Sequence, residues 1–232
     1  MEIRTFQSSN EVATEAALYI ADRIRESVAK KGFFTMAVSG GRTPWQMIKE
    51  LAKEELPWEK VFLFQVDERV APDGHADRNL TQLFNSIQGT PLVTRLNIFP
   101  MHVIAENLQE ACDQYAENIK LITETGKLDL IHLGIGTDGH TASLIPGDAV
   151  LDVQDQAVAM TSDPYQGRDR MTLTYPLINQ AEKILWIITG KEKAEMLSRL
   201  ISQDPTIPAG NVSQSRAIIL TEESAAETIN KF

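Results

Sequence analysis

Residues 128–147, LDLIHLGIGTDGHTASLIPG, decide the fold, because an apolar run of strand length ends there in closely spaced glycines. The apolar residues at 128–133 predict a buried strand. The glycines that follow allow the backbone to turn tightly or to approach a ligand closely, and they are Gly134, Gly136 and Gly139. We therefore expect a functional turn directly after this strand.

The same turn carries one acid and one histidine, Asp138 and His140. Residues 141–144 are expected to form a short helix, so the imidazole would lie near backbone donors that attract anions. Histidine titrates near neutral pH and can accept a proton from water, which suits a general base. The alternative is that the Gly and Asp residues serve only the geometry of a strand-to-helix turn.

Composition limits the class of protein. With 232 residues and 43% hydrophobic content, the chain is expected to form one α/β domain over residues 1–232. Its net charge of −10 argues against binding of nucleic acid and against attachment to an anionic membrane. The one cysteine, Cys112, excludes an internal disulfide. No export signal and no run of about 18 apolar residues is found, so we expect a cytoplasmic protein.

Apolar runs of strand length alternate with longer segments of helical period, which predicts a three-layer α/β fold with a mostly parallel central sheet. Strands are expected at residues 33–38, 61–66, 97–101, 128–133, 171–174, 183–189 and 217–221. Helices are expected at about 10–32, 43–54, 79–87, 105–123 and 191–201, with a last helix after residue 221. The segment 148–170 is expected to carry one or two further strands.

Capping signals mark the first two helices. Ser9 or Asn10 is expected to cap the first, and Gly32 to end it. Thr43 is expected to cap the second, with Pro44 in its first turn.

Polar clusters stand at or beside the ends of the apolar runs, at residues 39–43, 67–69, 134–140, 168–172 and 190–193. In an open parallel sheet, ligands bind outside the carboxyl ends of the strands, so clusters that are far apart in sequence can converge. We expect one pocket that uses all of them.

The first cluster, Ser39-Gly40-Gly41-Arg42-Thr43, places glycines before a helix. Exposed N–H groups, the helix dipole and the two hydroxyl groups can hold a phosphate there. The cluster is neither a Walker P-loop nor a complete GxGxxG, which disfavours nucleotide binding.

An acidic protein must build a local positive patch to bind an anion. Arg170 and Lys193 are the candidate counter-ions of a phosphate, with Arg168 as a further one. A lysine that opens a helix is usually a solvated charge, and it is the position of Lys193 just after a strand that favours a binding role. Arg42 adds another cation beside the glycine loop.

The second cluster follows another strand. Asp67 is a candidate for contacting the substrate or the imidazole, and Arg69 either faces a developing oxyanion or pairs with Glu68 or Asp67. His132 is expected to be a hydrogen-bonded core histidine. With four histidines and one cysteine, and without HExxH or CxxC, no zinc or iron site is expected. A GxSxG elbow is also missing, and the GxGxxG match at 134–139 lacks the acid that a nicotinamide cofactor requires.

Over nearly its whole length the chain resembles the 6-phosphogluconolactonase family. The residues that carry the resemblance are 39–44 (SGGRTP), 67–69 (DER) with 77–79 (DRN), 134–144 (GIGTDGHTASL) with 146–147, 170–172 (RMT) and 190–194 (GKEKA). The resemblance implies a Rossmann-like α/β fold shared with glucosamine-6-phosphate deaminases. It also implies hydrolysis of 6-phospho-D-glucono-1,5-lactone without a metal or an organic cofactor, with His140 as the base.

These considerations together give a set of expected site residues. The expected catalytic residues are His140, Asp67 and Arg69. The expected phosphate- and substrate-binding residues are Ser39, Gly40, Gly41, Arg42, Thr43, Asn79, Gly136, Asp138, Gly139, Arg170 and Lys193. The expected ligand is a sugar-phosphate lactone, and the expected assembly is a monomer or a weak homo-oligomer.

The chain departs from the family pattern at Arg42, where Ser or Thr is usual, and at Arg78, where Ser is usual. Both changes add a cation, which could strengthen attraction of the phosphate or change the shape of the pocket. The related deaminases carry a tyrosine in place of Arg69 and a glutamate in place of part of residues 141–146. The alternatives are a sugar-phosphate isomerase or deaminase and a non-catalytic sugar-phosphate binder, and the intact His140 argues against the second.

Overall fold

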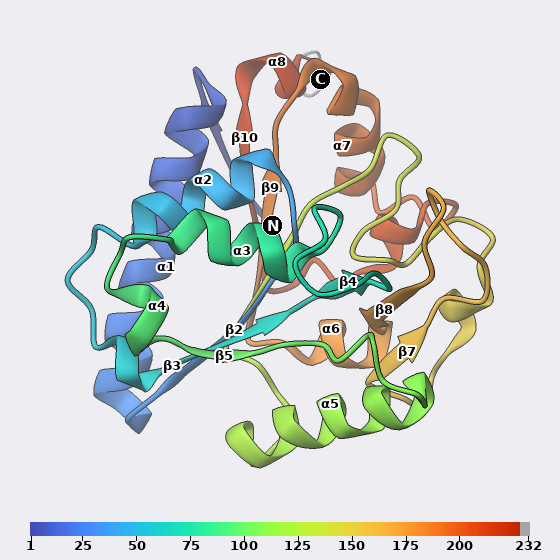
Figure 1. Ribbon diagram of the computed structural model, residues 1–232. Coiled ribbons are helices and arrows are strands. Elements are labelled where there is room, and N and C mark those ends of the chain that lie inside the picture. The colour runs from blue at the N-terminus through green and yellow to red at the C-terminus, as the bar shows by residue number, and fades with distance from the viewer. Residues whose placement is uncertain (228–232) are drawn as a thin grey trace.

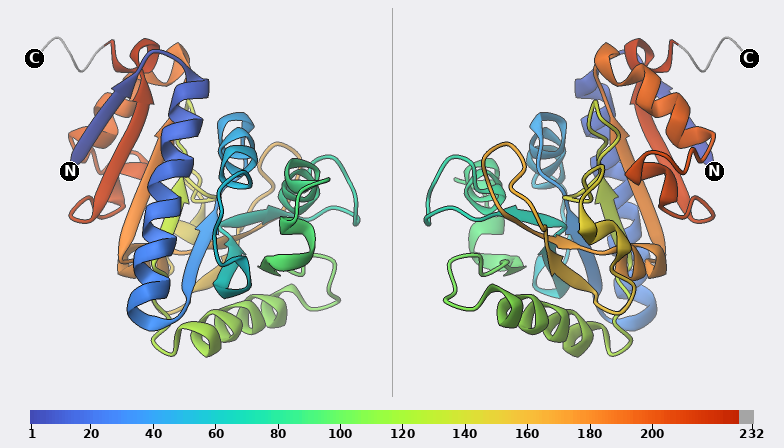
Figure 2. Two further views of the ribbon diagram at one scale, coloured as in Figure 1. Left: turned by 90° about the vertical axis from the view of Figure 1, so that its left-hand side faces the viewer. Right: turned by 90° about the vertical axis from the view of Figure 1, so that its right-hand side faces the viewer.

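A computed structural model describes residues 1–227, and its central element is a seven-stranded sheet with the order β1-β10-β9-β6-β2-β3-β5. Every neighbouring pair is parallel, which confirms the predicted sheet (Figure 1). The strands are β1 (Glu2–Phe6), β2 (Phe34–Val38), β3 (Val61–Gln65), β5 (Asn97–Phe99), β6 (Leu130–Leu133), β9 (Lys183–Ile188) and β10 (Ala217–Glu222). Figure 2 shows β1 beside β10 at one edge of the sheet.

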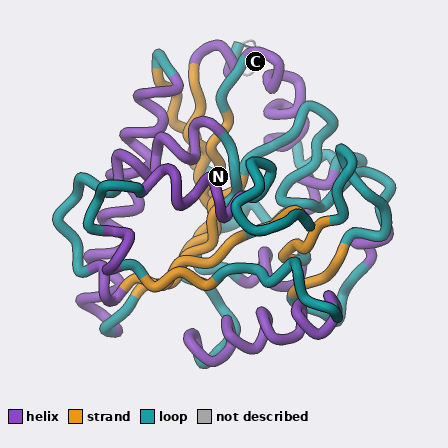
Figure 3. Tube along the Cα trace, viewed as in Figure 1, coloured by secondary structure: helices purple, strands orange, loops and turns teal. Residues whose placement is uncertain are grey.

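Helices cover both faces of this sheet, which confirms the three-layer fold (Figure 3). One face carries α1 (Ser9–Lys31), α2 (Arg42–Leu51) and α3 (Asn79–Ile87), and the other carries α5 (Leu108–Thr123), α6 (Tyr175–Gln180) and α7 (Ala194–Ile201). Successive residues of a strand point to opposite faces. In β9, Trp186 therefore enters the core under α5 and α6, whereas Leu185 enters the core under α1 and α2.

The longest helix, α1, begins one residue earlier than expected. Ser8 is the N-cap, with extended backbone angles, and its hydroxyl accepts a hydrogen bond from Glu11 N at 3.3 Å. Ser9 and Asn10 are therefore already helical, and the expectation that one of them caps the helix is wrong. The C-terminus is as predicted, since Gly32 adopts φ 89° and its N–H bonds to Val28 O.

A second, antiparallel sheet was not expected. It has the order β4-β8-β7 and is formed by β4 (Asp67–Arg69), β8 (Arg170–Leu173) and β7 (Val158–Met160). Residues 67–69, expected as a polar cluster after a strand, are themselves a strand, and Arg69 pairs with Arg170 across the ladder. This sheet brings the polar clusters at residues 67–69 and 168–172 together.

Residues 141–144 do not form the expected helix. Ala142 has φ 52°, and Leu144 N donates to Thr141 O at 2.9 Å in a tight turn. Polar groups of this turn form hydrogen bonds with other parts of the chain. The Thr141 hydroxyl donates to Gly134 O, and Ser143 N donates to the Thr172 hydroxyl. The helix N-terminus that was expected directly after His140 is therefore not formed by residues 141–144.

Other boundaries differ from the expected ones. The N-cap of α2 is Gly41, Thr43 lies inside the helix with its hydroxyl 2.8 Å from that of Thr189, and α2 ends at Leu51. The 3₁₀ helices are η1 (Trp58–Lys60), η2 (Ala149–Asp152), η3 (Lys191–Lys193) and η4 (Pro208–Asn211), and η3 makes up the start of the helix expected at 191–201. The remaining helices of residues 1–227 are the short α4 (Leu92–Arg95) and α8 (Glu223–Ala226). The helix expected after residue 221 begins as α8, and residues 228–232 lie outside the described part.

Candidate active site

Two adjoining cavities lie at the carboxyl ends of β2, β3, β6 and β9. The smaller, which we call the His140 cavity, has a volume of about 130 Å³, and the larger, the Arg42 cavity, has about 480 Å³. They share Gly40, Gly134 and Ile135. Expected site residues that line the His140 cavity are Ser39, Gly40, Asp67, Arg69, Asn79, His140 and Arg170. Those that line the Arg42 cavity are Gly40, Gly41, Arg42, Thr43 and Lys193.

The imidazole of His140 is held by a carboxylate. Its Nδ1 lies 2.6 Å from Asp138 Oδ1, and the His140 backbone N–H donates to the same oxygen at 3.2 Å. The Tyr165 hydroxyl donates to the other carboxylate oxygen at 2.9 Å. Within residues 1–227 the opposite ring nitrogen, Nε2, has no hydrogen-bond partner. An imidazole that donates Nδ1–H to Asp138 keeps a lone pair on Nε2, as a general base requires.

Asp138 is suited to this role because it stays ionised. Partial burial raises the pKa of its carboxyl, but the charge and hydrogen bonds of His140 and the hydroxyl of Tyr165 together lower it by more, so that its pKa lies below the usual value. Asp138 was expected among the substrate-binding residues. It contacts the imidazole instead, which is the contact considered for Asp67.

The glycines of this loop make room for the imidazole. A Cβ atom on Gly136 would lie 2.1 Å from His140 Nδ1 and 2.5 Å from Asp138 Oδ1. Gly139 has φ 85°, and a Cβ there would lie 2.6 Å from Ile207 Cβ. The loop also uses its own donors, since Gly136 N donates to His140 O and Gly139 N to Gly136 O. These N–H groups are therefore not free for a substrate oxyanion.

Asp67 is buried below the His140 cavity and is fully engaged by neighbouring side chains. Its Oδ2 accepts a hydrogen bond from the Ser143 hydroxyl at 2.7 Å, and its Oδ1 accepts one from Asn79 Nδ2 at 3.2 Å. Arg170 Nη1 lies 3.9 Å from Oδ2. Asp67 thus orders the wall of the cavity and makes no contact with the imidazole.

Two arginines face each other across the β4–β8 ladder, Arg69 and Arg170. Like charges placed opposite each other in a ladder repel. Burial, and next the charge of Arg69, lower the pKa of Arg170. Arg69 forms no ion pair with Glu68 or Asp67 in the described part of the chain: Nη1 donates to Asp77 O at 2.7 Å, and Nε is buried without a partner. The two guanidinium groups place positive charge at the His140 cavity, which suits an anionic oxygen.

Two further arginines are directed elsewhere. Arg168 pairs with Asp77 at 2.9 Å and does not reach either cavity. Arg78 is buried, lies 3.1 Å from Glu68 Oε2 and donates to Ala71 O at 3.0 Å. The additional cation at position 78 therefore neutralises a buried carboxylate and adds no charge to the pocket.

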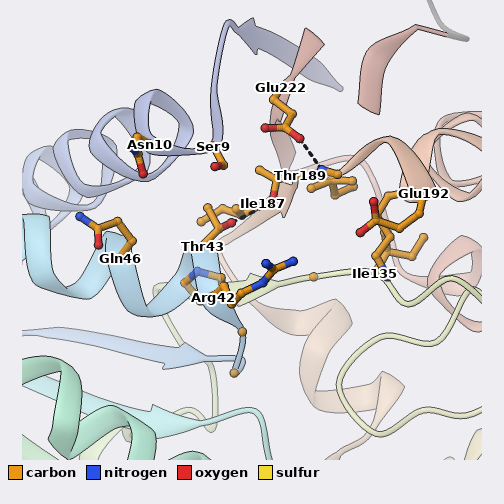
Figure 4. Close-up of a pocket in the computed structure, with 17 residues that line it drawn as sticks. Ser9, Asn10, Arg42, Thr43, Gln46, Ile135, Ile187, Thr189, Glu192 and Glu222 are labelled. Atoms are coloured by element: carbon orange, nitrogen blue, oxygen red, sulfur yellow. Dashed lines mark hydrogen bonds between the residues drawn. The ribbon is translucent and has the colours of Figure 1, made fainter. Parts of the chain in front are cut away.

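The Arg42 cavity is more open, and its cations are unpaired. Figure 4 shows the Arg42 side chain extending from the start of α2 toward the side of the cavity that is lined by Ile135 and Glu192. In residues 1–227 the side chains of Arg42 and Lys193 form no hydrogen bond and no ion pair. Burial lowers the pKa of Lys193. Across the cavity, Glu222 accepts a hydrogen bond from Gly190 N and so fixes the loop after β9.

His132 confirms the prediction of a hydrogen-bonded core histidine. It is fully buried, its Nδ1 accepts a hydrogen bond from Ser39 N at 3.2 Å, and the Ser39 hydroxyl donates to its carbonyl at 3.1 Å. Burial lowers its pKa to about 3, so the ring is neutral. His132 ties the start of the glycine loop to β6.

Sequence reasoning missed two residues that shape the site. Glu68 is fully buried, and its carboxylate accepts hydrogen bonds from the backbone N–H groups of Asn79 and Leu80 at 2.7 and 2.9 Å, which anchors α3 to β4. Glu68 stood in a recognised motif, but the sequence offered only Arg69 as its partner, whereas the fold gives it Arg78 and the start of α3. Tyr165 lies in a loop without periodicity, and nothing in the sequence relates it to Asp138.

Neither a metal cluster nor a membrane helix is found in the described residues. Among residues 1–227, no group of three or more His, Cys, Asp or Glu side chains is arranged to hold a metal ion. No helix in the same range has the length and apolar character that crossing a membrane requires.

Comparisons with known proteins agree with the fold and with the motifs. Residues 7–220 match the family described as glucosamine-6-phosphate isomerases/6-phosphogluconolactonase. A 6-phosphogluconolactonase of Synechocystis sp. is 32% identical over 231 residues, which cover 95% of each chain. The solved structure of a 6-phosphogluconolactonase from Trypanosoma cruzi has a TM-score of 0.85 at 25% identity and covers 98% of this chain and 96% of its own. A monomeric glucosamine-6-phosphate deaminase has a TM-score of 0.83 at 21% identity, with coverage of 98% and 99%.

Proposed function

The chain belongs to the glucosamine-6-phosphate isomerase/6-phosphogluconolactonase family, and on that premise we propose that it hydrolyses 6-phospho-D-glucono-1,5-lactone to 6-phospho-D-gluconate. This is the lactonase step of the oxidative pentose phosphate pathway, with His140 as general base and no metal. One observation carries the proposal: His140 is held by Asp138 through Nδ1 and keeps Nε2 free in a cavity that two arginines line.

The phosphate binds where the two cavities meet. Gly40 belongs to both, Arg170 lines the His140 cavity, and Lys193 lines the Arg42 cavity, so an anion at the junction can be approached by both cations. Arg42 adds a third cation on the more open side. Charge-assisted hydrogen bonds from such groups to phosphate are stronger than neutral ones. The lactone carbonyl then extends into the His140 cavity.

Hydrolysis follows from the free ring nitrogen. His140 Nε2 removes a proton from a water molecule as that water attacks the lactone carbonyl carbon. Asp138 stabilises the imidazolium that forms. The bond between the carbonyl carbon and the ring oxygen then breaks, and the ring oxygen takes the proton from the imidazolium. A general base of this kind contributes about 10² to 10⁴ in rate.

The tetrahedral oxyanion is assigned to Arg69. The backbone N–H groups of Gly136, Gly139 and His140, which a sequence argument would favour, are engaged inside their own loop. Arg69 lines the His140 cavity, its Nη1 is fixed by Asp77 O, and its Nη2 has no hydrogen-bond partner in the described residues. A donor already fixed in place at the site of developing charge lowers the barrier.

The deciding experiment uses freshly generated lactone. Acid release is followed with and without protein, before and after treatment with a chelator, and ammonia release from glucosamine 6-phosphate is measured in parallel. We expect accelerated acid release that survives chelation, and no ammonia. Ammonia release would identify a deaminase. Binding of 6-phosphogluconate with lactone decay at the spontaneous rate would identify a non-catalytic binder, and either result would overturn the proposal.

The deaminase alternative is disfavoured by the residues of the site. A deaminase shares the fold, as the solved structure shows. The residue after Asp67-Glu68 is nevertheless an arginine, and residues 141–146, TASLIP, contain no carboxylate that could assist ring opening.

A further inference from the structure

Tyr165, in the loop between β7 and β8, touches the base and its carboxylate. Its hydroxyl donates to Asp138 Oδ2 at 2.9 Å and lies 3.3 Å from His140 Nδ1. Its ring stands edge-on to the imidazole, with 5.2 Å between the ring centroids and an interplanar angle of 66°. The carboxylate is thus held at both oxygens, by His140 on one side and by Tyr165 on the other.

The same residue also contacts a buried cation of the site. The Tyr165 carbonyl accepts hydrogen bonds from Arg170 Nε and Nη2 at 3.4 and 3.3 Å. The Arg170 guanidinium carbon lies 5.0 Å from the centre of the Tyr165 ring, within the range of a cation–π contact. Tyr165 therefore connects the group proposed to activate water with a group proposed to hold the phosphate.

We propose that Tyr165 is a positioning residue for the lactonase reaction, an inference that rests on the proposed function. Its hydroxyl stops the Asp138 carboxylate from rotating and takes up part of the negative charge of that carboxylate. The ring thereby keeps its Nδ1–H directed at Oδ1, and Nε2 stays less basic than it would beside an unshared carboxylate. Through its ring and carbonyl, Tyr165 holds Arg170 in the same geometry.

Other charged groups around His140 are left unchanged by a substitution of the tyrosine hydroxyl. Asp67 and Arg69 of β4 and Arg170 of β8 line the cavity with His140. Lys193 of η3 is close enough to Asp138 for their charges to interact. A change in the titration of His140 after loss of the hydroxyl therefore reports on the bond to Asp138.

The test compares Tyr165→Phe with Tyr115→Phe. The hydroxyl of Tyr115 also makes buried hydrogen bonds, to the backbone of Gln65 at 2.6 and 3.0 Å, but it lines neither cavity. We expect Tyr165→Phe to lower kcat roughly threefold to tenfold, the size of one hydrogen bond, with KM within about twofold. In the pH profile of kcat/KM for Tyr165→Phe, the acid limb, where activity falls at low pH, should move to higher pH. Tyr115→Phe should lower the thermal unfolding midpoint and leave that limb in place.

Several results would overturn the inference. Tyr165 would be only a structural residue if the acid limb of kcat/KM in Tyr165→Phe stayed in place or moved to lower pH. The same would follow if Tyr165→Phe and Tyr115→Phe changed the kinetics equally. A second variant, Tyr165→Leu, removes the ring and should raise KM several-fold above that of Tyr165→Phe, because Arg170 loses its aromatic neighbour. Equal KM values in Tyr165→Leu and Tyr165→Phe would remove the link to Arg170.

A measurement without substrate separates this inference from the proposed function. The imidazole C–H signal of His140, assigned through its loss in His140→Asn, is titrated by NMR in the wild type and in Tyr165→Phe. An upward shift of the midpoint by at least about 0.3 pH units supports the role of the hydroxyl even if the lactone is not hydrolysed. A coincident titration would contradict it even in an active enzyme.

Discussion

The His140 cavity and the Arg42 cavity adjoin each other but are built differently. In and beside the first, polar side chains are held by neighbouring groups: Asp138 by the Tyr165 hydroxyl, Asp67 by Ser143, and Arg170 by the carbonyl of Tyr165. In the second, which is more than three times as large, the side chains of Arg42 and Lys193 have no hydrogen-bonding partner in residues 1–227.

Under the proposed function, this difference separates two tasks. A base must hold its geometry while a proton moves, and fixed groups achieve this because little reorganisation is left for the reaction itself. The negative charge of a phosphate is spread over its oxygen atoms, and cationic side chains that are free to move can approach those atoms from several sides. The variants below test this division, from the largest expected effect to the smallest.

Removal of the base should have the largest effect. His140→Asn keeps a side chain of similar size but cannot accept the proton, so kcat should fall by about 10² to 10⁴. The Kd for 6-phosphogluconate, measured by calorimetry, should stay within a few-fold, because the proposed phosphate ligands are intact. Near-normal turnover would refute the assignment of His140.

Crowding of the imidazole should have the next largest effect. Gly136→Ala places a methyl group where His140 Nδ1 now lies, so the ring must move away from Asp138, and kcat should fall about tenfold or more. Gly134→Ala is the matched comparison, since its Cβ would meet only Ile187 O, at 3.9 Å. It should lose much less activity. Equal losses of kcat in Gly136→Ala and Gly134→Ala would show that crowding of the His140 imidazole does not cause the loss of activity.

The two kinds of cation should differ in their effect on KM. Arg170→Met removes a buried charge with fixed partners and should raise KM about tenfold or more, the usual range for charged hydrogen bonds. Arg42→Ser removes an exposed charge and should raise KM about twofold to fivefold, less at high ionic strength. Steady-state kinetics at low and high salt provide the measurement. An equal or larger effect of Arg42→Ser would show that the buried, fixed Arg170 is not the stronger phosphate ligand.

The smallest effect concerns His132, beneath the glycine loop that both cavities share. Its pKa is about 3 in the folded protein and 6.5 in an unfolded chain. Between these values the unfolded chain binds a proton that the folded protein does not, so stability falls as the pH falls, by up to about 1.4 kcal/mol per pH unit. In His132→Gln, the loss of unfolding free energy between pH 7 and pH 5, measured with urea, should be smaller by about 1–2 kcal/mol. An unchanged pH dependence would contradict this account of His132.

Much of the architecture follows from local sequence patterns. The apolar runs at β2, β3, β6 and β9 are long enough to mark buried strands, and the apolar period of α1 marks a helix that covers a sheet. Parallel strands align their carboxyl ends, so the convergence of the clusters that follow β2, β3, β6 and β9 was predictable from topology. The cluster at residues 168–172 joins them through the antiparallel sheet, which was not predicted. His140 was found because glycines and an acid surround it directly after such a strand.

Other features depend on contacts that no local pattern encodes. The strand β1, EIRTF, is a short edge strand with mostly polar, exposed residues, and it carries no apolar run. The small antiparallel sheet pairs β4 with β8, segments of three and four residues that lie about a hundred residues apart in the chain. The exchange of roles between Asp67 and Asp138 is of the same kind. Two carboxylates were candidates for the imidazole, and only the fold shows that Asp138 reaches it while Asp67 bonds to Ser143.

The facing pair of Arg69 and Arg170 has a consequence for handling the protein. Their mutual repulsion weakens the empty fold and is relieved when a small dianion settles between them, so inorganic phosphate or sulfate should raise the melting temperature. The same ions would compete with a phosphorylated substrate. If this prediction holds, heat stability and affinity measured in phosphate buffer would include the effect of the bound anion, and a buffer of neutral or cationic components would avoid it.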